Sequence, residues 1–338
     1  MRILVTGGAG YIGSHAVKLL DARGEHVVTL DNLSSGHREA VTAGEFVLGD
    51  IGDRARLDEV LTRWHFDAVM HFASFIQVGE SVLEPAKYYD NNVVDTLTLL
   101  DSMLAHGIKR FIFSSSAAIF GEPNYTPIDE NHAKQPMNPY GFSKFAVERI
   151  LADYDRAYGL RSVCLRYFNA AGADPDGLLG ERHEPETHLI PLILRAAGIA
   201  SAHVKVFGDD YPTPDGTCVR DYVHVTDLVQ AHALALDWLE REKRSAAFNL
   251  GNGNGFSVNA VIAAARQVTG LPINVQVAAR RAGDPAVLVA DSATAKHDLG
   301  WVPQYDSLET IVQHAWVWEK NRRHDDAINQ SPGTTKKQ

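Results

Sequence analysis

The chain has 338 residues, of which 45% are apolar and 22% charged, a composition typical of a folded protein of one large or two ordinary domains and not of a disordered one. Its 32 Lys and Arg residues against 42 Asp and Glu give a net charge of −10, which argues against a general nucleic-acid binder or a protein of anionic membrane surfaces. The two cysteines, Cys164 and Cys218, exclude a disulfide scaffold and a Cys-rich zinc site.

The first 171 residues alternate short β-rich runs with longer stretches of helical periodicity. Strands are predicted at residues 3–6, 26–30, 45–48, 68–71, 111–114 and 162–167, and helices near 12–22, 54–64, 88–106 and 139–158. Strands that alternate with helices form βαβ units with right-handed crossovers. Residues 1–171 are therefore predicted to form a doubly wound, Rossmann-like α/β domain with a parallel sheet.

The regular alternation of strands and helices ends after Gly172. Residues 172–186 are rich in Gly, Pro, Asp and Glu and are predicted to form a loop. Two further segments follow at 189–200 and 205–207, helices are expected near 225–241, 258–269 and 308–319, and turns or Gly/Asn clusters occur at 209–216 and 251–255. We expect residues 172–320 to form a smaller α/β lobe that binds the substrate, with room for later segments to return to the first domain. Residues 321–338 are polar and aperiodic, which predicts a disordered tail.

A glycine-rich segment directly follows the first predicted strand and opens the first helix. Its glycines at positions 7, 10 and 13 suit a tight turn, a close approach to a pyrophosphate and close packing of helix on strand. Asp31, at the end of the second strand, can bind a ribose 2′-hydroxyl and would repel a 2′-phosphate, which favours NAD over NADP. Asp50 and Ile51, after the third strand, are candidates for the adenine side. The alternatives are a tight turn without a ligand and an ordinary strand end.

Tyr140 and Lys144 stand four residues apart at the start of a predicted helix, so they share one of its faces. A free phenol has a pKa near ~10 and is a poor base at neutral pH, but a neighbouring ammonium favours the phenolate. Three serines, 114–116, end the fifth strand, where doubly wound sheets bind their ligands. These patterns indicate acid–base chemistry on a hydroxyl. Alone, each of them also fits an amphipathic helix or a capped turn.

The segments TGGAGYIGSH, DNLSSG, GDI, FSSSAAIFG, NPYGFSK, RYFNAAG, FGDDYPTPDGTCVRDYVHV and RRAGDP occur in this order. From residue 1 to about residue 320 the chain therefore resembles the extended short-chain dehydrogenase/reductase family, and most of all its branch that inverts C4 of UDP-hexoses. The resemblance implies that Ser116 and Tyr140 are catalytic and that Lys144 is the electrostatic partner of Tyr140. Together with the glycine pattern it predicts an NAD site made of Gly7, Gly10, Tyr11, Ile12, Gly13, Asp31, Asn32, Asp50, Ile51, Phe72, Ala73, Asn91, Ser114, Tyr140, Lys144 and Tyr167.

The same resemblance implies a UDP-sugar site. Forked guanidinium groups suit phosphate oxygens, and an aromatic ring suits uracil. The implied residues are Ser116, Asn169, Leu189, Phe207, Arg220, Arg281 and Asp284. We add His188, which replaces a usual asparagine near the diphosphate, and Leu288, beside the sugar C2 substituent. Ile76 stands where many members have a lysine that touches the cofactor, and Phe120 where a tyrosine is common.

The predicted reaction is reversible C4 epimerisation of UDP-glucose and UDP-galactose through a 4-keto sugar, with the hydride shuttled by bound NAD. UDP-N-acetylhexosamines or UDP-pentoses are alternative substrates, and a non-catalytic NAD-sensing regulator is an alternative of another class. A 4,6-dehydratase is disfavoured, because Ala117 and Ala118 stand where its acidic pair is expected.

No metal is predicted, since the segment from His183 to His188 lacks HExxH spacing and contains Pro185, which is incompatible with a helical zinc site. No apolar stretch approaches 18 residues, and residues 2–6 are strand-like rather than a signal peptide. We therefore expect a cytoplasmic protein without membrane or nucleic-acid partners. The resemblance further implies a homodimer, formed through the helices near 88–106 and 139–158.

Overall fold

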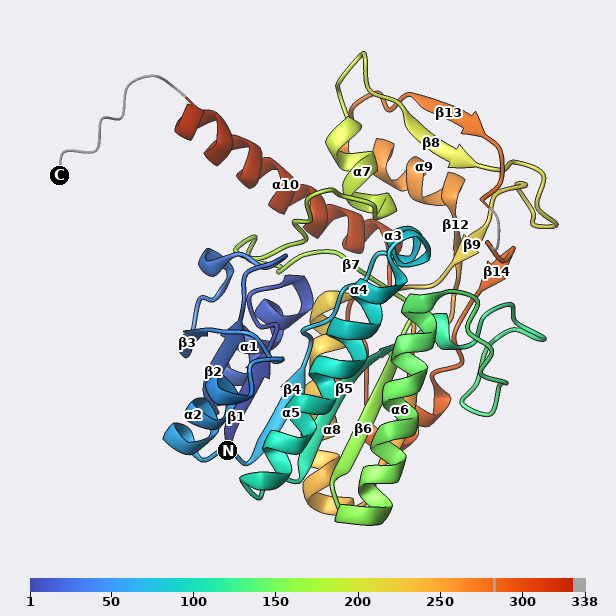
Figure 1. Cartoon of the computed structure of the whole chain (residues 1–338). Coiled ribbons are helices and arrows are strands. Elements are labelled where there is room, and N and C mark those ends of the chain that lie inside the picture. Colours follow the sequence, from blue (N-terminus) through green and yellow to red (C-terminus); the bar gives the residue numbers. More distant parts are fainter. Residues whose placement is uncertain (282–283, 331–338) are drawn as a thin grey trace.

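Seven parallel strands form the central sheet of the computed structural model, which describes residues 1–281 and 284–330 (Figure 1). The order across the sheet is β11-β6-β5-β4-β1-β2-β3, so the order in which strands are added reverses between β1 and β4, where doubly wound sheets bind ligands. This arrangement confirms the predicted Rossmann-like α/β class. The strands are β1 (Arg2–Thr6), β2 (His26–Asp31), β3 (Glu45–Leu48), β4 (Ala68–His71), β5 (Arg110–Ser116), β6 (Arg161–Tyr167) and β11 (Ala246–Leu250).

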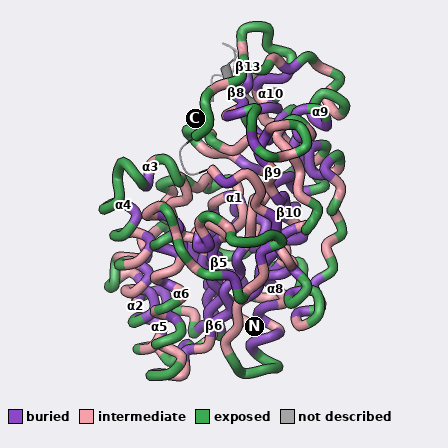
Figure 2. Tube along the Cα trace, turned by 90° about the vertical axis from the view of Figure 1, so that its right-hand side faces the viewer, coloured by how far each residue is buried: buried purple, intermediate pink, exposed green. Residues whose placement is uncertain are grey.

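Helices cover both faces of the sheet. One face packs against α1 (Tyr11–Ala22) and α8 (Val225–Glu242), and the other against α2 (Arg54–Trp64), α5 (Asp95–Ala105) and α6 (Pro139–Tyr158). In β5, Ile112 joins the first of these cores, and its neighbours Phe111 and Phe113 join the second. Because side chains alternate along a strand, a continuous apolar run serves both layers. The buried residues accordingly lie along the middle of the molecule in Figure 2.

The second part of the chain builds a smaller layer around a separate hydrophobic core. Strands β8 (Val204–Phe207) and β13 (Val275–Ala278) pair in parallel beside α7 (Leu189–Ala196) and α9 (Val258–Thr269). Short strands connect this layer to the main sheet: β12 (Phe256–Ser257), β9 (Val219–Arg220) and β14 (Val287–Leu288) form one group, and β7 (Asn169–Ala171) and β10 (Tyr222–His224) another. Strand β11 and helix α8 return to the main sheet. The boundary at Gly172 stays a prediction.

The predicted helix at 88–106 is divided in the structure. After α3 (Val78–Leu83), the chain forms α4 (Pro85–Tyr89), a π-helical turn η2 (Asp90–Val94) and then α5. Inside η2, the Asn92 side chain accepts a hydrogen bond from the Phe75 backbone N–H (2.9 Å) and donates one to the Phe75 carbonyl (3.0 Å). π-Helical turns are frequent at functional sites.

The disordered tail predicted from residue 321 is wrong over its first ten residues, since α10 (Leu308–Gln330) is helical to its end. Glu319, whose side chain is 5% exposed, pairs with Arg322 (2.8 Å) and Arg323 (3.0 Å), and Arg323 also donates to the Leu194 carbonyl (2.7 Å). Ion pairs at i,i+3 and i,i+4 stabilise a helix whose composition looks polar. Residues 331–338 lie outside the described part of the chain. Among the described helices, none combines the length and apolarity needed to cross a bilayer.

Candidate active site

The glycine-rich segment forms a cradle between β1 and the start of α1. Gly7 has φ +74°, and a Cβ there would lie 2.5 Å from the Ala73 backbone nitrogen. A Cβ on Gly13 would lie 2.8 Å from the Gly8 Cα atom, so helix and loop touch backbone to backbone. Gly10 caps α1 without a side-chain hydrogen bond, which leaves the first N–H groups of the helix to an anion. The cradle therefore fits a pyrophosphate.

Asp31 lies at the edge of this cradle. Its carboxylate accepts hydrogen bonds from the backbone N–H of Ala9 (2.9 Å) and of Leu33 (2.8 Å), which fixes its orientation. Burial raises the pKa of Asp31, and these two hydrogen bonds oppose the shift. A carboxylate has further lone pairs, so Asp31 can still accept from a ribose hydroxyl.

The other predicted NAD residues lie around the same strand ends. The Phe72 N–H donates to the Thr6 carbonyl (2.8 Å), and this brings Phe72 and Ala73 against the cradle. On the far side, Asn32 Nδ2 donates to Asp50 (2.7 Å), and Ile51 is buried. Asn91 donates to Asn92 in η2 (2.8 Å). Tyr11 and Ile12 begin α1, and Tyr167 ends β6.

The three serines that end β5 have different partners. The Ser115 hydroxyl donates to Glu148 (2.6 Å), on the face opposite to that of Ser114 and Ser116. Ser114 lies 2.9 Å from Nε2 of His232, a buried residue of α8. Because His232 Nδ1 donates to the Leu228 carbonyl (2.9 Å), Nε2 accepts from the Ser114 hydroxyl. The Ser116 hydroxyl accepts from the Ala118 N–H (3.1 Å) at the turn η3 (Ala117–Ile119).

Tyr140 and Lys144 lie beside Ser116, on the first turns of α6. Asn138 caps this helix by accepting from the Gly141 N–H (2.8 Å), and Pro139 occupies the first turn. Lys144 is 2% exposed and donates to Ser74 Oγ (2.8 Å) and to the Ser114 carbonyl (2.9 Å). The structure thus brings the three predicted catalytic residues together at the carboxyl end of β5.

Burial dominates the electrostatics of this group. It lowers the pKa of Lys144 to about 7 and raises the pKa of Tyr140, while a hydrogen bond with Ser116 opposes the shift at Tyr140. The Lys144 ammonium stands 6.0 Å from the centre of the Tyr140 ring. The chain alone therefore holds a protonated phenol at neutral pH, and a cationic group bound in the cradle would favour the phenolate.

Two arginines of the predicted substrate site lie in the smaller layer. Arg220 donates through Nη1 to the Pro285 carbonyl (2.9 Å) and pairs through Nη2 with Asp284 (3.3 Å). The Arg281 guanidinium lies 3.9 Å from the centre of the Phe207 ring, at the end of β8. A cation and an aromatic ring therefore occur next to each other, the combination that a diphosphate joined to a base requires.

Leu288 connects this layer to the catalytic serine. It pairs with Arg220 between β14 and β9, and, like Ala117, it packs against a small core that contains Ile119 and Phe120, in the turn after Ser116. Asn169 lies in β7, where its N–H donates to the Asp221 carbonyl (3.0 Å). Leu288 therefore lies between the turn after Ser116 and Arg220, and Asn169 contacts Asp221, the residue after Arg220.

Leu189 begins α7, and His188 precedes it. Nδ1 of His188 lies 2.7 Å from Oε1 of Glu181 and 3.0 Å from Oε1 of Glu186. Burial alone would lower the pKa of His188, but the two carboxylates raise it to about 10. This nitrogen is therefore engaged and leaves Nε2 as the ring atom that can meet a diphosphate.

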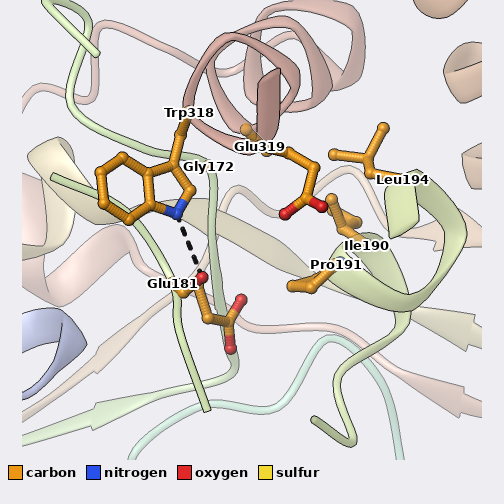
Figure 3. Close-up of a pocket in the computed structure, with 8 residues that line it drawn as sticks. Gly172, Glu181, Ile190, Pro191, Leu194, Trp318 and Glu319 are labelled. Carbon is orange, nitrogen blue, oxygen red and sulfur yellow. Dashed lines mark hydrogen bonds between the residues drawn. The ribbon is translucent and has the colours of Figure 1, made fainter. Parts of the chain in front are cut away.

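Sequence reasoning missed Ser74, Asn92 and His232. Ser74 is a direct partner of Lys144, Asn92 joins Phe75 to Ser143 of α6 (3.1 Å), and His232 holds Ser114. Asn92 adjoins the predicted Asn91, but no motif of the sequence marks the other two. The pocket in Figure 3, by contrast, contains no predicted site residue. It lies between the 172–188 loop, α7 and α10 and is lined by Gly172, Glu181, Ile190, Pro191, Leu194, Ala315, Trp318 and Glu319.

Comparison with known proteins agrees with this geometry. A family model described as the NAD dependent epimerase/dehydratase family matches residues 3–251. The chain belongs to this family. The matched segment ends just after β11, so it contains the whole central sheet, the cradle and the Ser116–Tyr140–Lys144 group.

Within the NAD dependent epimerase/dehydratase family, the chain is similar to several UDP-glucose 4-epimerases. It is 54% identical over 324 residues to the one from Halalkalibacterium halodurans, a match that covers 96% of this chain and 97% of that protein. The crystal structure of the enzyme from Brucella ovis in complex with NAD is 51% identical, with a TM-score of 0.91 over 93% of this chain and 97% of that one. The enzyme from Stenotrophomonas maltophila, with bound NAD and formylated UDP-arabinopyranose, is 40% identical, with a TM-score of 0.93 over 96% and 99%.

Proposed function

We propose that the chain is an NAD-dependent isomerase that interconverts UDP-glucose and UDP-galactose by inversion at C4. The observation that carries the proposal is the convergence of Ser116, Tyr140 and Lys144 at the end of β5, beside a backbone cradle that fits a pyrophosphate. The names of the relatives, UDP-glucose 4-epimerases, support the same reaction.

In this proposal Tyr140 is the general acid and base. Its phenolate accepts the proton of the sugar 4-hydroxyl and later returns it. Ser116 interacts with the phenol and holds the sugar hydroxyl in line with it. Lys144, fixed by Ser74 and Ser114, contributes the positive charge that lowers the pKa of the phenol. Bound NAD supplies the acceptor and donor of the C4 hydride.

The cradle, Asp31 and the strand ends around Phe72 and Asp50 would hold NAD. Arg220 and Arg281 would bind the diphosphate, with Phe207 against uracil. Firm binding of UDP and weak binding of the sugar let the ring present either face to Tyr140 without leaving the site. Leu288, next to the turn that follows Ser116, would limit the room beside the C2 substituent.

A homodimer is the expected assembly. Apolar side chains are exposed on the surface shared by α4, η2 and α6: Tyr89 is 37% exposed, Val94 52% and Phe142 49%. Tyr89 and Phe142 are in edge-to-face contact, with ring centres 6.0 Å apart. An exposed apolar patch of this kind favours a self-complementary interface between two copies.

The purified protein, incubated with UDP-galactose and separately with UDP-N-acetylgalactosamine without added reductant, tests the reaction. Proton NMR follows the C4 epimers. Conversion of UDP-galactose alone supports the proposal together with a restrictive C2 pocket, and conversion of both substrates adds N-acetylated sugars. No conversion of either, with NAD retained, would overturn the proposal in favour of another sugar nucleotide or a non-catalytic role.

A further inference from the structure

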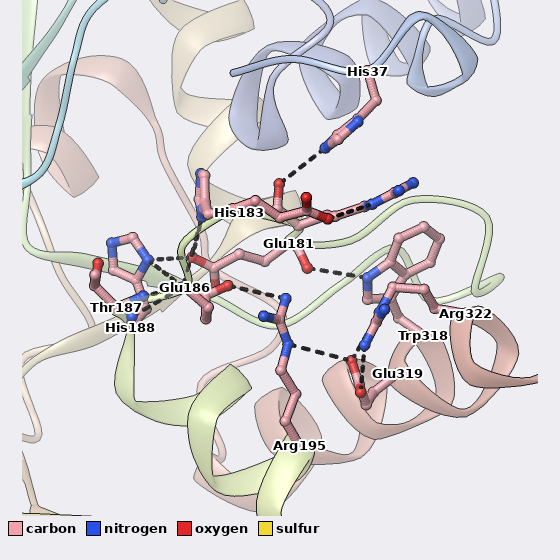
Figure 4. Close-up of polar contacts among 12 residues, drawn as sticks. His37, Glu181, His183, Glu186, Thr187, His188, Arg195, Trp318, Glu319 and Arg322 are labelled. Atoms are coloured by element: carbon pink, nitrogen blue, oxygen red, sulfur yellow. Dashed lines mark hydrogen bonds and ion pairs between the residues drawn. The ribbon is translucent and has the colours of Figure 1, made fainter. Parts of the chain in front are cut away.

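Four side chains that could bind a metal converge in the loop between β7 and α7 (Figure 4). They are Glu181, His183, Glu186 and His188, and each offers one ligand atom within 4.8 Å of all the others. The atoms that approach each other are Nδ1 of both histidines and Oε1 of both glutamates. When both histidines release their Nδ1 protons, two nitrogen donors and two anionic oxygen donors form a complete ligand set for one divalent ion.

The distances within this group suit a tetrahedron. His183 Nδ1 lies 3.2 Å and 3.8 Å from the Oε1 atoms of Glu181 and Glu186, and His188 Nδ1 lies 2.7 Å and 3.0 Å from the same two atoms. Ligands at about 2.0–2.1 Å from a tetrahedral zinc ion are about 3.3 Å apart. The four observed separations lie on both sides of that value.

Burial gives this group a need for positive charge. The side chains of Glu181 and Glu186 are 7% and 2% exposed, and both direct Oε1 toward the same two rings. Two buried carboxylates that face each other are unfavourable unless cations lie between or beside them. In addition, His183 Nδ1 is buried between the two carboxylates, 3.2 Å from Glu181 Oε1 and 3.8 Å from Glu186 Oε1. A metal ion placed among these atoms would meet the lone pair of this nitrogen once its proton is released.

Surrounding contacts hold the four residues in place. The backbone N–H groups of Thr187 (2.8 Å) and His188 (3.0 Å) donate to Glu186 Oε1, and Arg195 of α7 lies 3.4 Å from Oε2 of the same carboxylate. The Trp318 indole of α10 donates to the Glu181 carbonyl (3.2 Å). These contacts fix the positions of Glu181 and Glu186, as the surrounding hydrogen bonds of metal ligands do in proteins.

We propose that Glu181, His183, Glu186 and His188 bind one Zn²⁺ ion in a closed structural site. Imidazole nitrogens favour zinc over Mg²⁺ and Ca²⁺, which prefer oxygen ligands. Four protein ligands leave no open position, so the ion is structural and not catalytic. The HExxH spacing applies to zinc ligands on a helix. It is not needed here, because these four residues precede α7 in a non-helical loop.

The site would connect the loop to the cofactor cradle. The ring of Tyr11, the first residue of α1, lies edge-on to the His183 ring with centres 6.5 Å apart, and its hydroxyl donates to the Gly172 carbonyl (2.7 Å). Leu189, a predicted substrate residue, directly follows His188. Bound zinc would therefore fix the start of α7 and the loop against the first turn of α1.

The test uses the full-length protein without a histidine tag, stripped with a chelator, exposed to Zn²⁺ and dialysed. Metal content is measured by inductively coupled plasma mass spectrometry. The wild type should retain about one zinc per chain, and Glu181→Gln and His183→Gln should retain at least about tenfold less. His37→Gln is the matched control, because His37 Nε2 contacts the Arg182 carbonyl of the same loop (3.3 Å) but belongs to no ligand set. His37→Gln should bind zinc like the wild type.

A second readout separates metal binding from a folding defect of the variants. Zn²⁺ added to the stripped wild type should raise its Tm, and Mg²⁺ should not, because a ligand of the native state stabilises it. Co²⁺ in place of zinc should give the intense visible absorption of tetrahedral coordination. The proposal is overturned if the stripped wild type takes up no more zinc than His183→Gln and its Tm does not respond, since the four side chains would then form an ion-pair cluster without a metal.

Discussion

Lys144 faces the Tyr140 ring, with its Nζ atom 6.0 Å from the ring centre, yet its hydrogen bonds go to Ser74 and to the Ser114 carbonyl. Lys144 is therefore held by Ser74, which follows β4, and by Ser114, near the end of β5. In the proposed mechanism its protonated form acts on the phenol through its charge. A phenol whose pKa is raised by burial depends on that charge to work as a base.

Tyr140→Phe should reduce kcat by about 10²–10⁴-fold, the usual contribution of a general acid–base group. NAD should stay bound, because the cradle and Asp31 are untouched. A coupled assay of UDP-glucose formation measures the rate, and nucleotide released by denaturation measures the cofactor. Near-normal activity of this variant would contradict the role of Tyr140.

Ser115 and Ser116 form a matched pair for a second prediction. Ser116→Ala should lower kcat by about 10²-fold with little change in Tm, because its hydroxyl interacts with the phenol. Ser115→Ala should leave the rate unchanged but reduce the free energy of unfolding by about 1–3 kcal/mol, since it removes a hydrogen bond to the carboxylate of Glu148, which also pairs with buried Arg166 (2.6 Å). Steady-state kinetics and urea unfolding distinguish the two effects. The reverse pattern would mean that the serines have exchanged roles.

The cradle and the sheet could be predicted from the sequence because their signals are local. Glycine spacing, strand alternation and the i,i+4 relation of Tyr140 and Lys144 lie within short windows, and residues that end parallel strands meet at one edge. His232 could not be predicted in the same way. It comes from a helix more than a hundred residues after Ser114, and its partner is set by how α8 packs on the sheet.

Two further outcomes depended on tertiary contacts. Polar composition predicted a loose tail, but a single buried carboxylate, Glu319, pairs with two arginines and extends α10. The segment from His183 to His188 was judged against helical spacing alone. In the structure it is a loop, so residues at irregular spacing bring their side chains to one point.

Buried histidines predict how stability depends on pH. Burial lowers the pKa of His232 to about 4, from an ordinary value near ~6.5. Between these two pKa values, His232 binds a proton in the unfolded chain but not in the folded chain. The contribution of neutral His232 to the free energy of unfolding is therefore fully present above about pH 6.5 and is lost as pH falls toward 4. Urea unfolding at a series of pH values should show the free energy of unfolding decreasing across that window.

His232→Gln should make this decrease shallower, because glutamine does not titrate. His297→Gln is the control, as the side chain of His297 is 88% exposed. An unchanged slope in His232→Gln would show that other groups govern the acid sensitivity.

The apolar patch around Phe142 predicts the assembly. Phe142→Glu places a charge where two copies would meet and should shift the protein from dimer to monomer, because an unpaired charge buried in an interface is costly. Val302→Glu, at a residue that is 68% exposed outside this patch, should remain dimeric. Light scattering coupled to size-exclusion chromatography gives the mass. A dimer that survives Phe142→Glu would place the interface elsewhere.

Leu288 predicts substrate choice. Its side chain packs against the small core that contains Phe120, beside the turn that follows Ser116, so truncation opens space where the C2 substituent of the sugar is expected. Leu288→Ala should raise kcat/KM for UDP-N-acetylgalactosamine relative to UDP-galactose by about tenfold, within the 10–200-fold range that a few methylenes can supply. Val287→Ala is the matched control, because Val287 is the neighbouring residue of β14 and successive side chains of a strand point to opposite faces. If both substitutions change the ratio of kcat/KM for the two substrates equally, Leu288 has no specific role at C2. Its contribution would then be the pairing of β14 with β9.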